Sequence, residues 1–234
     1  MVNYEELPLF PLQVVLYPDM PLPLHVFEPR YREMILKCVE EKAVFGIVLS
    51  DANEASESLS MSNTVGTTAR ITQYEILGDG RINIEVVGET RFRVTQTKSG
   101  SVYPSAKVEP FWEQSADPLS LQSSFDQACQ LFRAYLRSLL ANSNRSLSSV
   151  QLPREPECLS YAIASVLQIS LTEKQRLLEI TNTERRLIRE IEILIEEIAS
   201  AERFDSLQGS VIEETAPGIS ELLVKDFIGL ISRN

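Results

Sequence analysis

The pattern of apolar and polar positions divides the chain into a strand-rich first half and a helix-rich second half. Between residues 65 and 111 apolar positions recur at every second residue, as at Ile82, Ile84 and Val86. That period places apolar side chains on one face of a sheet. From residue 117 onward the spacing changes to three and four, the period of an amphipathic helix. The pattern therefore predicts an α+β fold.

The first half is expected to form a compact, mainly antiparallel sheet or partly closed barrel with one early helix. We expect that helix over residues 28–41, a buried strand over residues 44–49 and a solvated loop over residues 51–63. The sequence GDG at residues 78–80 is typical of a hairpin turn. Gly88 interrupts the next strand and is expected at a bulge or bend.

A proline-rich stretch, residues 7–34, precedes this sheet. It holds half of the chain's 12 prolines among apolar residues that need burial. Proline lacks a backbone N–H, so the interior of a central strand or helix cannot hold this density. Short edge strands broken by bends satisfy both requirements, and Pro29 fits the first turn of a helix.

The second half predicts a helical bundle. One helix begins at the N-cap Asp117 and a second at Pro156, while Thr172 with Gln175 suggests a capping box for a short third helix. The fourth helix is expected over residues 183–203.

These elements suggest three regions: a β subdomain over residues 1–115, a bundle over residues 116–204, and a linker with an amphipathic C-terminal helix over residues 205–234. Deleting that last region is expected to leave the fold intact.

Composition and charge restrict the classes of function that the chain can have. The apolar share of 44% and the charged share of 24% are those of an ordinary globular protein. The net charge of -11 opposes non-specific binding to nucleic acid or anionic lipid. The chain has no apolar run of about 20 residues, and its N-terminus lacks the basic start of a signal peptide. We expect a cytoplasmic protein that does not contact membranes.

Signals of catalysis are nearly absent. The sequence contains neither the phosphate-binding GxxxxGK[ST] loop nor a GxSxG elbow, and His25 is its single histidine. Three dispersed cysteines without CxxC spacing argue against a zinc site. We therefore predict no catalytic residue, no metal and no cofactor, and we expect His25 to be structural.

The strand arginines Arg70, Arg81, Arg91 and Arg93 offer a second candidate chemistry, a nucleic-acid surface. Acidic residues interleave with them, which favours cross-strand ion pairs instead.

Five short motifs follow one another along the chain: LPLFPL at residues 7–12, LHVFEPRY at 24–31, GT at 66–67, DGR and RFR between 79 and 93, and KQ with LLE and RL between 174 and 187. In this order they resemble the N-terminal domain of the Lon protease family, over residues 5 to 203. The resemblance implies a PUA-like β-domain followed by a helical bundle. Full-length members continue into ATPase and peptidase domains, whose motifs this sequence lacks, so we expect a stand-alone, non-enzymatic form.

The positions that carry the resemblance are expected to be structural. They are Pro8, Phe10, Pro11, His25, Glu28, Arg30, Tyr31, Gly66, Thr67, Gly80, Arg81, Gly88, Arg91 and Phe92.

The resemblance implies a module that binds unfolded or specific polypeptides, as an adaptor or chaperone-like factor in protein quality control. A protease or chaperone would then be a partner, and self-association is compatible with this role. Such binding needs exposed apolar surface or free strand edges, and we select Tyr17, Met20, Leu22 and Phe27 as candidates. Two alternatives stay open: a PUA-like RNA-binding protein and a β-domain with a pocket for a small ligand.

Overall fold

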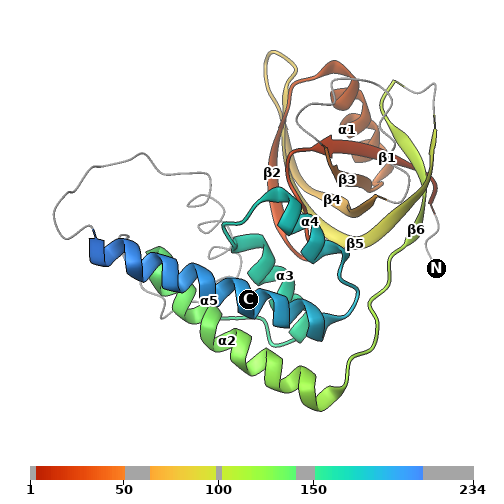
Figure 1. Ribbon diagram of the computed structural model, residues 1–234. Coiled ribbons are helices and arrows are strands. Elements are labelled where there is room, and N and C mark those ends of the chain that lie inside the picture. Colours follow the sequence, from red (N-terminus) through yellow and green to blue (C-terminus); the bar gives the residue numbers. More distant parts are fainter. Residues whose placement is uncertain (1–3, 51–63, 99–101, 141–150, 208–234) are drawn as a thin grey trace. The chain divides into compact units, whose positions relative to one another are not determined.

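The computed structural model describes residues 4–50, 64–98, 102–140 and 151–207 (Figure 1). Contacts group the described residues into two units. The first contains the residues up to Trp112 together with Ile169–Thr181, and the second contains Glu113–Gln168 and the residues from Asn182 onward. The loop expected at 51–63 and the amphipathic helix expected at the C-terminal end of residues 205–234 lie outside the described residues.

The described residues of the first unit form six strands and two helices (Figure 1). They are β1 (Tyr4–Leu12), β2 (Pro21–Val26), α1 (Pro29–Glu41), β3 (Phe45–Leu49), β4 (Val65–Ile76), β5 (Ile82–Lys98), β6 (Ser105–Pro110) and α4 (Leu171–Glu179). The strand order is β2-β5-β4-β3-β1-β6, and a further β5–β6 pairing closes the sheet into a barrel, with β2 outside the ring. Among these pairings β1 and β3 run parallel and the others antiparallel. The predicted fold is confirmed.

The prolines of β1 are accommodated because its two halves have different neighbours. Pro8 lies in the half that pairs with β6, whereas Pro11 lies in the half that pairs with β3. The prediction of edge strands is therefore wrong for β1 as a whole, which lies between two strands. Within the described ranges each half nevertheless has one side without a pairing strand, where the missing N–H of proline costs no ladder hydrogen bond.

The barrel core is a cluster of buried apolar residues from β1, β3, β5 and β6. Its members are Leu7, Leu9, Val48, Phe92, Val94, Ala106 and Val108. The buried face of α1 includes Tyr31, Ile35 and Cys38. The ring of Tyr31 stacks on Phe10 of β1 at a centroid distance of 4.3 Å.

The α4 helix belongs to the first unit, to which its backbone and side chains are hydrogen-bonded. The Tyr17 hydroxyl donates to the Lys174 carbonyl at 2.9 Å, and the Gln175 amide donates to the Val65 carbonyl at 3.0 Å. Both contacts join α4 to segments more than 100 residues earlier in the chain. The sequence pattern had placed this helix in the bundle.

Arg91 holds the C-terminal end of α4. It is buried, and one guanidinium nitrogen donates to the carbonyls of Leu178 and Ile180 at 2.6 and 2.8 Å. Carbonyls in the last turn of a helix have no partner within the helix, so a cation is well placed there.

The N-terminus of α4 differs from the prediction. Its N-cap is Ser170, whose hydroxyl accepts from the backbone N–H of Glu173, so the capping box predicted from Thr172 and Gln175 is wrong. Ser170 is followed by a glutamate three residues later, which is itself a capping-box pattern in the sequence. The prediction chose Thr172 and Gln175 instead.

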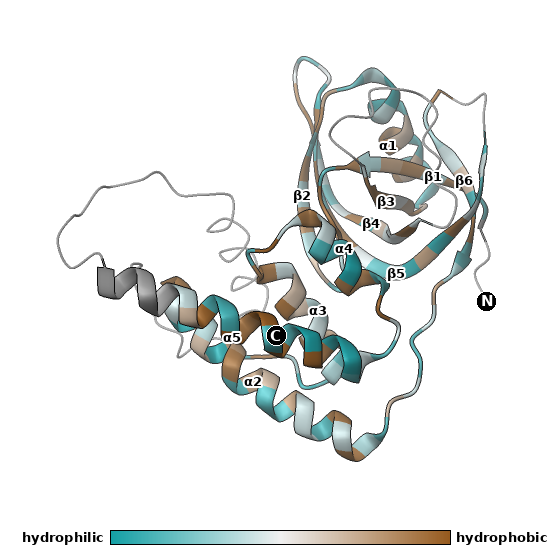
Figure 2. Ribbon diagram, viewed as in Figure 1, coloured by the Kyte–Doolittle hydropathy of each residue, from teal (hydrophilic) through white to brown (hydrophobic). Residues whose placement is uncertain are grey.

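In the second unit, the part of the chain that the structure describes contains three packed helices: α2 (Pro118–Leu140), α3 (Pro156–Val166) and α5 (Thr183–Leu207). The side chain of Asp117 accepts the backbone N–H of Ser120 at 3.0 Å, which confirms the predicted N-cap. Figure 2 shows hydrophilic and hydrophobic residues alternating along α5, as its spacing predicts. Over the described ranges no helix has the length and apolar content needed to cross a membrane.

A polar cluster lies inside this bundle. The guanidinium of Arg186 is fully buried and donates to Ser160 at 2.7 Å and to Glu113 at 2.9 Å. Ser160 in turn donates to Glu190 at 2.8 Å. Glu190 is fully buried, and loss of hydration raises the pKa of its carboxyl well above the usual range, against the opposing effect of Arg186.

Candidate functional site

A three-strand sheet extends from the barrel where β2, β5 and β4 run side by side. β2 pairs with β5 from Pro21 to Val26, and β4 pairs with β5 as far as Ile76. β3 pairs with β4 only as far as Ala69, so beyond that point β4 has no second neighbouring strand in the described part of the chain. This extension, which we call the three-strand sheet, has an outer face and two outer edges.

A tight turn fixes the end of the three-strand sheet. The N–H of Gly80 donates to the Leu77 carbonyl, and the N–H of Leu77 donates to the Arg81 carbonyl, both at 2.8 Å. Gly80 has φ of +79°, the left-handed conformation that closes a three-residue hairpin loop. The hairpin predicted from GDG is confirmed. Hydrogen bonds from the backbone and then the guanidinium of Arg81 lower the pKa of Asp79 in this turn.

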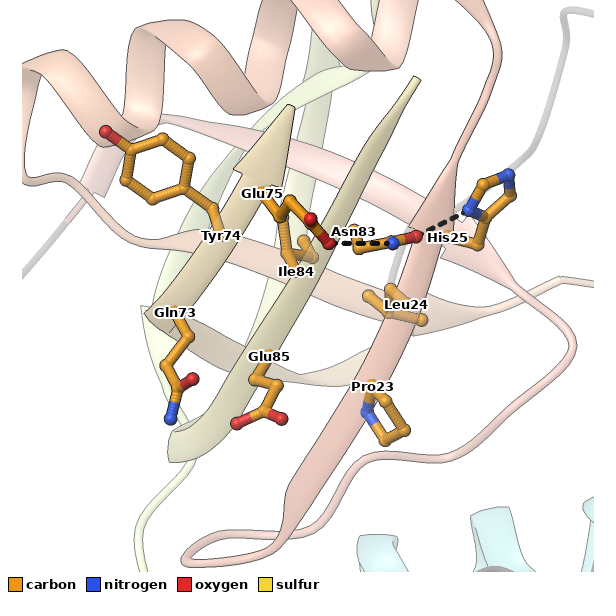
Figure 3. Close-up of a pocket in the computed structure, with 9 residues that line it drawn as sticks. All are labelled: Pro23, Leu24, His25, Gln73, Tyr74, Glu75, Asn83, Ile84 and Glu85. Carbon is orange, nitrogen blue, oxygen red and sulfur yellow. Dashed lines mark hydrogen bonds between the residues drawn. The ribbon is translucent and has the colours of Figure 1, made fainter. Parts of the chain in front are cut away.

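The outer face carries a polar row that crosses all three strands (Figure 3). Asn83 lies opposite His25 on one side and opposite Glu75 on the other. Its oxygen accepts from Nδ1 of His25 at 2.7 Å, and its nitrogen donates to Glu75 at 3.5 Å. Arg81 lies 3.3 Å from Nε2 of His25. Since the carboxamide oxygen only accepts, this arrangement places the ring proton on Nδ1.

A second row, Gln73, Glu85 and Pro23, lies beside the first. Between the rows is a shallow depression of about 370 Å³. The residues that line it are Pro23, Leu24, His25, Gln73, Tyr74, Glu75, Asn83, Ile84 and Glu85 (Figure 3).

The charge of this outer face is negative. Arg70 pairs with Glu89, and Arg81 pairs with Asp79, so both cations are neutralised by carboxylates of their own. Glu85 has no ion-pair partner among the described residues, and no group of three potential metal ligands occurs in those same ranges. The carboxylate of Glu85 therefore leaves this face able to attract a cationic group.

Large apolar side chains are exposed at the margins of the three-strand sheet. Phe27, next to β2, is 61% exposed, and Tyr74 and Ile76 of β4 are 53% and 55% exposed. The Phe27 ring stacks beside His25 at a centroid distance of 6.5 Å.

The candidates chosen from the sequence separate into two groups. Tyr17, Met20 and Leu22 are buried in the core, and Phe27 is exposed. The four side chains thus do not form one exposed patch, and burial removes the first three from contact with a ligand. Tyr74 and Ile76 were missed; their signal is two large apolar residues that continue β4 up to the turn.

Several motif residues contact one another within the first unit. Phe92 lies against Gly66, and the Thr67 hydroxyl donates to the Leu16 carbonyl at 2.6 Å. Glu28 and Arg30 form an exposed ion pair at 3.1 Å.

Gly88 allows two backbone segments to meet. Its N–H donates to the Met20 carbonyl at 3.0 Å, and its carbonyl accepts from Asp19 at 2.9 Å. A Cβ at this position would overlap the carbonyl of Tyr17. The ladder between β4 and β5 shifts register beside it, as expected of a bulge.

A family model for the substrate-binding domain of the ATP-dependent protease La (LON) matches residues 6–196. The chain belongs to the Lon substrate-binding domain family. Lon protease of Escherichia coli K12 is 28% identical over 188 residues, which cover 78% of this chain and 24% of that protein. The Schizosaccharomyces pombe LON peptidase N-terminal domain and RING finger protein C14F5.10c is 28% identical over 211 residues, 78% of this chain and 43% of that protein. The family member described here thus spans about a quarter of the bacterial protease.

Two solved structures of Lon N-terminal domains share the fold. The Xanthomonas campestris domain has a TM-score of 0.57 at 24% identity and covers 79% of this chain and 95% of its own. The Mycobacterium avium complex domain has a TM-score of 0.55 at 18% identity and covers 83% and 98%.

Proposed function

We propose that this chain is a non-enzymatic polypeptide-binding module that acts as an adaptor or chaperone-like factor in protein quality control. Membership of the Lon substrate-binding domain family supports this role, because the matching model is that of the substrate-binding domain. The absence of a nucleotide loop and a nucleophile elbow from the sequence supports a module without catalysis of its own.

The single observation that carries the proposal is the three-strand sheet with its exposed apolar margins. Phe27, Tyr74 and Ile76 are all more than half exposed at the periphery of one small sheet. Unfolded polypeptides are bound through apolar side chains and unpaired strand edges, and this sheet supplies both.

The strand arginines do not favour RNA binding. Arg70 and Arg81 are paired with carboxylates, and Arg91 is buried against carbonyls. Arg93 lies over the ring of Phe111 at 4.6 Å. With these cations engaged and a net charge of -11, a phosphate backbone would meet few available partners.

Fluorescence anisotropy with a labelled, reduced and alkylated polypeptide tests the proposal directly. We expect the chain to bind this unfolded polypeptide and to leave a structured RNA unbound over a salt series from 50 to 300 mM. Tight RNA binding that falls steeply with salt would instead identify a nucleic-acid-binding protein.

A matched pair of variants localises the binding. Phe27→Ala is expected to weaken polypeptide binding by about five- to tenfold, the loss typical of truncating a contact residue. Leu119→Ala is the control, because Leu119 is 84% exposed but lies in the second unit. If the two variants weakened polypeptide binding equally, the three-strand sheet would not be the binding site.

A further inference from the structure

We infer that the outer edge of β4, at Tyr74 and Ile76, binds an extended polypeptide segment with alternating apolar and basic residues as an added strand. This inference rests on the proposed function and adds a binding mode, a position and a ligand chemistry to it. Three observations support the inference: the backbone geometry of the β4 edge, the contrast between this edge and that of β2, and the charge of the outer face.

The backbone groups of Tyr74 and Ile76 point away from the sheet. In an antiparallel ladder, residues alternate between those bonded to the neighbouring strand and those turned outward. The bond from Leu77 to the Arg81 carbonyl sets this alternation, so Glu75 and Gln73 bond to β5. Tyr74 and Ile76 then present two N–H donors and two carbonyl acceptors to the outside. Every residue from Thr72 to Ile76 is exposed.

The opposite edge of the three-strand sheet lacks this capacity. On β2 the bond from Gly88 to the Met20 carbonyl sets the alternation, which turns Pro21, Pro23 and His25 outward. Two of these three residues are prolines without an N–H, and prolines protect exposed edges from strand addition. Strand addition is therefore blocked on β2 and open on β4.

Side chains along β4 determine the ligand's sequence pattern. Tyr74 lies opposite Ile84 and points away from the polar row, whereas Gln73 and Glu75 face outward with it (Figure 3). An added strand would place alternate side chains beside Tyr74 and Ile76, where apolar residues bury exposed surface. The intervening side chains would lie beside Glu75, with the unpaired Glu85 on the next strand within reach of a lysine or arginine. The pattern that fits is apolar, basic, apolar.

The same charge disfavours a second copy of this chain. Antiparallel pairing of two β4 edges centred on Glu75 would bring two like carboxylates directly opposite each other, which is destabilising. These carboxylates attract a strand with basic side chains and repel a second copy of this chain. The edge therefore favours a segment of another protein.

Proline substitution tests the edge, because a proline there removes an outward N–H and leaves the bonds to β5 intact. The probe is a labelled, end-capped nine-residue peptide of alternating valine and lysine, used beside the unfolded polypeptide. We expect Tyr74→Pro to bind both probes about tenfold more weakly than Tyr74→Ala, which removes the same side chain but keeps the donor. Ile76→Pro against Ile76→Ala repeats the comparison, and a valine–glutamate peptide is expected not to bind.

Hydrogen exchange of the unaltered chain gives an independent readout if a proline variant folds poorly. On saturation with the valine–lysine peptide, exchange of the Tyr74 and Ile76 amides is expected to slow at least tenfold, with little change at His25. If exchange at both amides is unchanged, or if the proline and alanine variants bind equally, the β4 edge is not the binding site. The proposal that the chain binds polypeptides is unaffected by that result. Failure of the unaltered chain to bind either probe overturns both proposals. Concentration-dependent dimerisation abolished by Tyr74→Pro would assign the edge to a second copy and also overturn the inference.

Discussion

At the scale of single residues, the closest approaches between backbone segments determine which side chains are tolerated. Gly88 sits where β5 meets the segment between β1 and β2, with the Tyr17 carbonyl where a Cβ would be. Gly78, ten residues earlier in the hairpin turn, has open space around the same position and no positive φ. The two glycines are chemically identical, and their surroundings predict opposite sensitivities.

Gly88→Ala is expected to destabilise the first unit by about 3 kcal/mol, because the backbone of Tyr17 must move to admit the methyl group. Gly78→Ala is the control and is expected to change the free energy of unfolding by less than about 0.5 kcal/mol. Urea unfolding followed by circular dichroism measures both. Equal stability of the two variants would show that β5 tolerates a side chain at this crossing.

The sequence could predict part of this arrangement. A glycine inside an alternating strand signals a bulge or a close approach, and the register shift lies beside Gly88. Which segment approaches it is a long-range contact that local pattern does not encode. The same holds for Tyr17, Met20 and Leu22, whose apolar character predicted either binding or core packing and which are buried.

At the scale of elements, two ionisable side chains of α5 lie in the interior of the bundle. Arg186 and Glu190 are one turn apart and fully buried, together with Ser160 of α3. An arginine and a glutamate four residues apart are typical of a solvated helix face, so the sequence pattern does not predict their burial. This burial is tolerable because Glu113 and Ser160, which belong to other segments of the chain, are hydrogen-bonded to the Arg186 guanidinium.

Arg186→Met is expected to destabilise the second unit by about 3 kcal/mol, because it removes the buried ion pair with Glu113 and the hydrogen bond to Ser160. Chemical unfolding at pH 7 measures the change. Arg189→Met is the control, since Arg189 forms an exposed pair with Glu192; its loss should cost less than about 1 kcal/mol.

Glu190→Gln should alter how stability depends on pH. Burial raises the pKa of Glu190 in the folded chain above its unfolded value of 4.5. The protonated carboxyl therefore stabilises the fold fully below pH 4.5, and this contribution is lost as pH rises through the folded pKa. We expect Glu190→Gln to match the unaltered chain near pH 4.5 and to exceed its unfolding free energy at pH 8. A glutamine variant that is less stable at pH 8 would mean that the ionised carboxylate is needed beside Arg186.

At the scale of the whole molecule, the first unit consists of two separate stretches of chain. Residues Ile169–Thr181 return to the sheet after α3 and before α5. The sequence predicted the barrel, the early helix and the bundle helices, because the spacing of apolar residues that indicates each of them can be recognised within a short stretch of chain. It did not predict the return of α4, since that depends on single hydrogen bonds from Tyr17, Gln175 and Arg91 across long separations.

A fragment of residues 1–112 is expected to melt about 10 °C or more below the first unit of the full chain, because Arg91 and Val65 lose their partners on α4 and apolar surface is uncovered. A synthetic peptide of residues 169–181, added in excess, is expected to raise the melting temperature again by mass action. A peptide of residues 118–130 serves as the control. A fragment as stable as the first unit of the full chain would make α4 a peripheral attachment.

The interleaved connectivity also fixes an order of events during translation. The barrel strands leave the ribosome first, but the buried guanidinium of Arg91 meets the carbonyls of Leu178 and Ile180 only after residue 180 has emerged. At typical rates of synthesis, residues 113–181 add roughly 3 to 14 seconds. During that interval the surface that α4 will cover is open to water and to chaperones, and Arg91 has not yet formed its bonds to the two carbonyls.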